Sequence, residues 1–122
     1  MELLVCVINR EEELERILAG FVELKITGAT VISSEGMGRF VSRGELPVLA
    51  GLQSVIDAAR PQNTTVFSVI DDPQKLKAAV AMIQQVCGDL GAPGTGIVFT
   101  VPVGRAYGLA PGLEEDRNTA GK

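Results

Sequence analysis

The sequence predicts one α+β domain, in which a four-stranded antiparallel sheet carries two helices on one face. Apolar patterns along the chain follow the order strand, helix, strand, a connection, and then strand, helix, strand again. Right-handed crossovers place both helices of two such βαβ units on the same side of the sheet. This is the ferredoxin-like split βαβ arrangement. It leaves the other sheet face uncovered, and we therefore expect oligomerisation through that face.

The first unit opens with an apolar run that ends near Ile8, which we interpret as a buried strand. Asn9 is the expected N-cap of the next helix, with Glu12 as its capping-box partner. The acidic run at 10–15 is expected to be a solvated first turn. Apolar residues then recur at helical spacing, at Leu14, Ile17, Leu18, Phe21 and Leu24. Gly28 ends this pattern, and residues 29–32 are the expected second strand.

The second unit repeats this design from a strand at 65–70. Asp71 or Asp72 is the expected helix cap, and Pro73 suits the first helical position. The apolar face of this helix consists of Leu76, Ala79, Val80, Ile83 and Cys87. A glycine-rich turn follows, and the last strand is expected at 97–103.

The domain is expected to span residues 1–109. The connection between the two units, residues 40–63, is longer than a simple turn. Within it, apolar residues keep helical spacing over 47–59, which predicts a short amphipathic helix ending before Pro61. The polar segment 110–122 is expected to be a disordered tail.

Composition excludes several classes of protein. The chain has 122 residues, an apolar fraction of 46% and a formal net charge of −4, without the basic patch of a nucleic-acid binder. No apolar run is long enough for membrane insertion, and no signal peptide is visible, so we expect a cytoplasmic protein. With no histidine and only Cys6 and Cys87, a zinc site or a Cys-His nucleophile is excluded. Both cysteines are expected to be small core residues.

Two glycine-rich turns are the candidate binding motifs. Residues 36–39, Gly-Met-Gly-Arg, follow the second strand, and Arg39 offers a cation for a phosphate or carboxylate. Residues 91–96, Gly-Ala-Pro-Gly-Thr-Gly, precede the last strand, and their backbone N–H groups can form an anion-binding nest. Each turn is also explained without a ligand, as a tight connection at the end of a strand or helix.

Both turns, in this order, resemble the nitrogen-regulatory PII proteins and their PII-like relatives. Residues 26–31, Ile-Thr-Gly-Ala-Thr-Val, and 35–39, Glu-Gly-Met-Gly-Arg, resemble the second strand and the base of the family's long T-loop. Residues 94–99, Gly-Thr-Gly-Ile-Val-Phe, with Val-Pro-Val at 101–103, resemble its B-loop and final strand. The likeness covers about residues 1–109. It implies that residues 40–63 correspond to the family's T-loop in a rebuilt form.

The resemblance implies a homotrimer that binds a small-molecule effector in the clefts between subunits. The ligand classes that it implies are AMP, ADP, ATP, a cyclic nucleotide or an anion such as bicarbonate, and no other cofactor is indicated. One side of each cleft would be formed by Thr30, Gly36, Met37, Gly38 and Arg39. The neighbouring subunit would supply Gly91, Gly94, Thr95 and Gly96.

The chain departs from the family at the positions of its phosphate-binding cations. Family members carry a lysine at the position of Ile97 and basic residues at those of Gly108 and Ala110. Phe40 stands in place of a glutamine that is associated with 2-oxoglutarate and magnesium, and the only tyrosine, Tyr107, lies outside the T-loop. Tight ATP binding and uridylylation are therefore not expected.

Three functions remain open at this level. The first is a PII-like signal-transduction regulator that senses a small ligand and reports it to a regulated protein, such as a transporter or an enzyme. The second is a trimeric scaffold that has lost the ligand. The third is an acyl-phosphate hydrolase using Arg10 after the first strand, but no phosphate cradle or general base accompanies it. We expect a regulator and not an enzyme.

Overall fold

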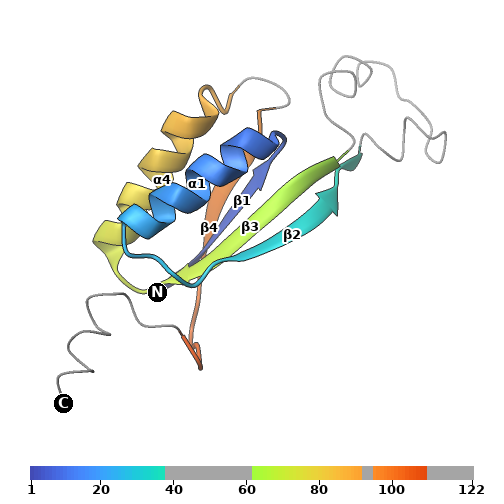
Figure 1. Cartoon of the computed structure of the whole chain (residues 1–122). Coiled ribbons are helices and arrows are strands. Elements are labelled where there is room, and N and C mark those ends of the chain that lie inside the picture. Colours follow the sequence, from blue (N-terminus) through green and yellow to red (C-terminus); the bar gives the residue numbers. More distant parts are fainter. Residues whose placement is uncertain (38–61, 92–94, 110–122) are drawn as a thin grey trace.

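The computed structural model describes residues 1–37, 62–91 and 95–109 and confirms the predicted α+β fold. Its four strands form one antiparallel sheet in the order β2-β3-β1-β4. Both helices lie on the same side of this sheet (Figure 1). The elements in chain order are β1 (Glu2–Ile8), α1 (Glu11–Glu23), β2 (Thr30–Glu35), β3 (Gln62–Ile70), α4 (Pro73–Cys87) and β4 (Ile97–Pro102).

Strands β2 and β3 are longer than the sequence indicates. β2 continues to Glu35, which pairs with Gln62 at the start of β3. These ends are polar and lack the alternation of a half-buried strand, so only cross-strand pairing identifies them. Residues 62 and 63 thus belong to β3 and not to the connection. The helix predicted at 47–59 and the tail at 110–122 lie outside the described residues.

The predicted capping box of α1 is wrong. The N-cap is Arg10, in extended conformation, and its side chain makes no capping hydrogen bond. Glu11, Glu12 and Glu13 occupy that turn, where carboxylates interact favourably with the helix dipole. The expectation of a fully solvated first turn is also wrong, because Glu13 is only 8% exposed.

Helix α4 begins as predicted. The carboxylate of Asp72 accepts hydrogen bonds from the backbone N–H of Gln74 at 2.8 Å and of Lys75 at 3.4 Å. Pro73 occupies the first turn, where it lacks an N–H that would otherwise need a partner. This cap stabilises the helix by about 1 kcal/mol.

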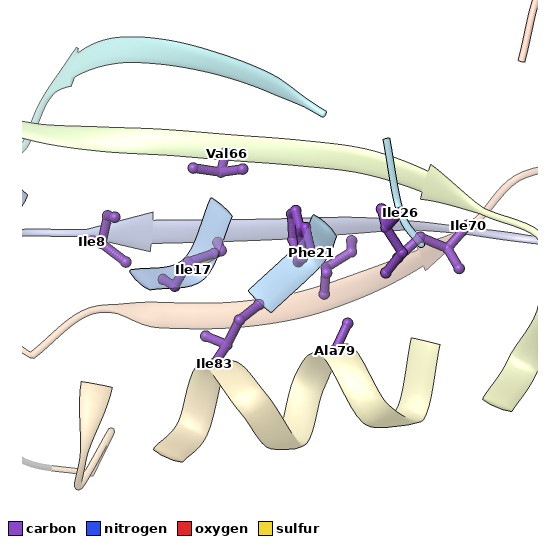
Figure 2. Packing of buried hydrophobic residues seen from close by; sticks show 10 residues of the cluster. Ile8, Ile17, Phe21, Ile26, Val66, Ile70, Ala79 and Ile83 are labelled. Carbon is purple, nitrogen blue, oxygen red and sulfur yellow. The ribbon is translucent and has the colours of Figure 1, made fainter. Parts of the chain in front are cut away.

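The hydrophobic core lies between the two helices and the sheet (Figure 2). Gly20 allows the helices to approach closely, because a Cβ there would lie 2.7 Å from the side chain of Met82. Ser68 is buried among apolar neighbours and donates a hydrogen bond to the carbonyl oxygen of Gly28 at 2.6 Å. The buried apolar residues are Leu4, Cys6, Ile8, Ile17, Phe21, Ile26, Val66, Ile70, Ala79 and Ile83.

Candidate functional site

The two glycine turns lie at the same end of the sheet but at its opposite edges. Gly36 follows β2, and Gly96 precedes β4. The end of β1 at Ile8 pairs with Thr64 near the start of β3, which places both turns beside this end. Strands β3 and β1 separate them (Figure 1). Three inter-strand spacings, about 14 Å, therefore lie between the two edges at which these turns occur.

The first turn is exposed where the structure describes it. Met37 is 66% exposed and Gly36 is half-buried, while Gly38 and Arg39 lie outside the described residues. Thr30 lies opposite Phe67 in the β2–β3 pair, so both side chains project from the same sheet face. That face is the one without helices, because the alternate residue Val66 is buried in the core.

The second turn contains one glycine whose conformation is required. Gly96 has φ +123°, and a Cβ there would lie 2.5 Å from the carbonyl oxygen of Val7. The backbone N–H of Gly91 donates to the side chain of Asp89 at 2.9 Å, so this group is already used within the turn. Thr95 is half-buried, and Gly94 lies outside the described residues.

The sheet face without helices, here termed the open face, is predominantly apolar. Its central row runs across three strands, from Phe99 through Val5 to Phe67, because these residues are register partners. The open-face residues of β4 are well exposed, with Ile97 at 53%, Phe99 at 43% and Val101 at 42%. Antiparallel sheets that face water usually alternate apolar and polar residues, so this face is suited to burial against another surface.

Two of the positions at which the sequence resemblance implies cations carry no charge. Ile97 adds an apolar side chain to the row that it shares with Val7. Gly108 has φ +81° and lies in an exposed segment next to Tyr107, which is 87% exposed. Ala110 lies outside the described residues.

A groove that the sequence did not predict lies beside α1 and β2. Its volume is about 1000 Å³. Arg10, considered at first only for acyl-phosphate chemistry, lies at the groove and forms an ion pair with Glu13 at 3.8 Å. Nothing in the spacing of Ser33 or Thr64 indicates that they meet there, since only strand pairing brings them together. The groove is lined by Asn9, Arg10, Glu11, Leu14, Val31, Ser33, Ser34, Glu35, Gln62, Asn63 and Thr64.

The two cysteines lie on the helix side and are poor nucleophiles. Burial raises the pKa of Cys6 to about 12, and the Glu13 carboxylate adds to this effect. The pKa of Cys87 is likewise raised to about 12, first by burial and then by its interaction with Glu13. A thiol with so high a pKa stays protonated at neutral pH and reacts slowly. Cys6 is a core residue as predicted, whereas Cys87 is half-buried.

Neither a metal centre nor a membrane helix is present in the part of the chain that the structure describes. No three His, Cys, Asp or Glu side chains among residues 1–37, 62–91 and 95–109 are placed to hold a metal ion. Neither α1 nor α4 is long and apolar enough to cross a bilayer.

The fold and the placement of the two turns define a ferredoxin-like α+β domain whose candidate binding elements lie at both edges of one sheet. A comparison with protein families matches residues 1–112 to the nitrogen regulatory protein P-II. Because this match covers nearly the whole chain, the protein belongs to the P-II family and is a P-II-type regulatory signalling protein. A search of curated proteins finds no similar sequence.

Proposed function

We propose that this protein is a homotrimeric P-II-type sensor that binds an adenine nucleotide or a small anion between its subunits. Ligand binding would favour one conformation of the connection at 40–63, and a regulated protein would recognise that conformation. The observation that carries this proposal is the position of the glycine turns at opposite edges of the same sheet end. In the proposed trimer, a second copy would bring one turn against the other.

The open face supports assembly through the sheet. Phe67, Phe99 and Val5 form an apolar row that a neighbouring copy could cover. Burial of apolar surface contributes about 25 cal/mol per Å², so a face of this kind favours association. Trimerisation would place a β2 edge next to the β4 edge of the next subunit, and we assign the effector site to that cleft.

The described part of the cleft favours a ligand with little phosphate charge. Ile97 and Gly108 stand where cations would be expected, and Gly91 donates its N–H within its own turn. Each missing charge-assisted contact costs about 1.5–3 kcal/mol of phosphate binding. We therefore expect AMP, a cyclic nucleotide or bicarbonate to bind in preference to ATP.

The assembly is tested with Phe99→Glu, because Phe99 is half-exposed in the single chain and the fold should tolerate the change. Light scattering should show a trimer for the unchanged protein and a monomer for this variant. Val22→Glu is the matched control, since Val22 is 58% exposed but lies on α1, away from the open face. A monomeric unchanged protein, or a trimeric Phe99→Glu variant, would contradict the proposed interface.

The ligand is tested by thermal unfolding with adenine nucleotides, cyclic nucleotides, bicarbonate and 2-oxoglutarate. A ligand at 100 times its Kd stabilises the folded state by about 2.7 kcal/mol. Thr30→Val should reduce the shift because Thr30 lies on the open face of β2. Thr100→Val on β4 is the control, since Thr100 pairs with core residue Leu4 and projects toward the helix side. An intact trimer that responds to no ligand would favour the scaffold function.

A further inference from the structure

The groove beside α1 exists because the two helices do not cover the whole sheet. Helix α1 packs against α4 and β1, and α4 also packs against β1 and β3, whereas β2 has no comparable contact with either helix. Strand β2 is the edge strand on this side. Val31, on the helix side of β2, is consequently 44% exposed, although its register partner Val66 is fully buried.

The groove combines an apolar patch with a polar wall. Leu14 is packed against the core, and Val31 lies on the same side of the sheet. Ser33 and Thr64 are register partners in β2 and β3, so their side chains lie side by side on this face. A ligand there could place an apolar group on Leu14 and Val31 while hydrogen bonding to the two hydroxyls.

Charges at the groove include both signs. Arg10 has a 60% exposed side chain, and its ion pair with Glu13 is long at 3.8 Å. An arginine has five N–H donors, so a second carboxylate can bind to it. Glu11 and Glu35 also line the groove. One cation and two carboxylates disfavour a polyanion but suit a ligand that carries one positive and one negative group.

We propose that this groove binds a free α-amino acid with an apolar side chain. The α-carboxylate pairs with Arg10, and the ammonium group lies toward the groove carboxylates. The side chain packs on Leu14 and Val31. A volume of about 1000 Å³ lies within the usual range for small-molecule sites. The site lies within one chain and on the helix side of the sheet. It therefore does not depend on the cleft or on the trimer of the proposed function.

Calorimetric titration with L-leucine tests this site. Two probes of similar shape separate the charge contributions: 4-methylpentanoate lacks the ammonium group, and isoamylamine lacks the carboxylate. Leucine should bind at least about tenfold more tightly than either probe, because each lacks one charge-assisted contact. Absence of leucine binding at about 10 mM overturns the proposal. Equal binding of 4-methylpentanoate, or tighter binding of succinate, overturns the assignment to a zwitterion.

Two variants locate the site. Arg10→Gln should weaken leucine binding about tenfold or more, whereas Arg16→Gln, an exposed change on the same helix and outside the groove lining, should not. Because Arg10 is also the N-cap residue of α1, Ser33→Phe provides a second variant that obstructs the groove from β2. Leucine binding that survives both changes overturns the proposal. Leucine binding with no response to nucleotides or bicarbonate would separate this site from the proposed inter-subunit site.

Discussion

The two faces of the sheet are both apolar, but only one is covered by the chain itself. On the helix side, Leu4, Cys6 and Ile8 of β1 are each 1% exposed. On the open face, Phe99 and Val101 of β4 keep more than 40% of their surface in contact with water. Strand alternation alone does not distinguish these faces, because both contain Val, Ile and Leu. The difference shows that the chain has one intramolecular core and a second surface suited to an intermolecular one.

The largest loss of stability is expected when a buried side chain on the helix side of the sheet is truncated. Phe21→Ala should destabilise the fold by about 3–5 kcal/mol, because Phe21 is 2% exposed and its removal leaves a cavity. Val22→Ala, at the next position of the same helix and 58% exposed, should change stability by less than about 0.5 kcal/mol. Urea unfolding of both variants measures the difference. Similar losses would contradict the assignment of the core to the helix side.

A smaller effect, dependent on protein concentration, is expected from Phe99→Ala on the open face. Phe99 is half-exposed in the single chain, so the intrinsic loss should be about 1 kcal/mol. If copies associate through this face, the loss increases as protein concentration rises, because assembly stabilises only the unchanged protein. Melting temperatures over a hundredfold range of concentration provide the test. A loss of stability that does not depend on protein concentration would contradict assembly through the open face.

Removal of a hydrogen-bonding serine should cost more stability on the helix side of the sheet than on the open face. Ser68→Ala removes a donor at 2.6 Å from the Gly28 carbonyl in a site that is 3% exposed, and should cost about 1–2 kcal/mol. Ser34 contacts Asn63 at 2.5 Å and Thr65 at 2.8 Å at the less buried end of the open face. Ser34→Ala should cost less than about 1 kcal/mol, because water can replace the lost partner. Chemical denaturation of the two variants compares these costs, and an equal or reversed order would be unexpected.

At mildly alkaline pH, the smallest effect is a loss of stability that originates on the helix side of the sheet. The folded-state pKa of Cys6, about 12, exceeds the ordinary value of 9.0, so the unfolded chain loses this proton first. The contribution is complete below pH 9 and is lost as the pH rises from there toward 12. Urea midpoints measured above pH 9 should fall, and Cys6→Ala should make this fall shallower. An unchanged slope in the variant would show that other groups cause it.

Much of the fold could be predicted because the relevant patterns are local. Helical spacing identified the buried face of each helix, and Asp72 with Pro73 marked the start of α4. The start of α1 was missed because Asn9 is a preferred N-cap residue, whereas Arg10, the observed N-cap, is not. The choice between them depends on how β1 leads into the helix. Residues 62 and 63 were missed for a related reason, since their strand conformation depends on pairing with β2.

The candidate site was predicted less completely. Glycine turns are visible in a sequence, but their positions at opposite edges follow from the strand order β2-β3-β1-β4. The groove exists because the two helices cover only part of the sheet. No short sequence motif predicts this partial cover. Glu13 was assigned to a solvated turn because its neighbours are charged, yet packing between α1, α4 and the sheet buries it.

The sequence by itself determined the order of the elements, the apolar faces of the helices and both glycine turns, because each depends on residues close together in the chain. Only the tertiary structure decided which apolar face of the sheet is covered, that Glu13 is buried and that Arg10 borders a groove with Ser33 and Thr64. These features depend on contacts between segments distant along the chain. Packing of α1 between α4 and the sheet buries Glu13, and the limited width of two helices leaves the groove and the open face uncovered.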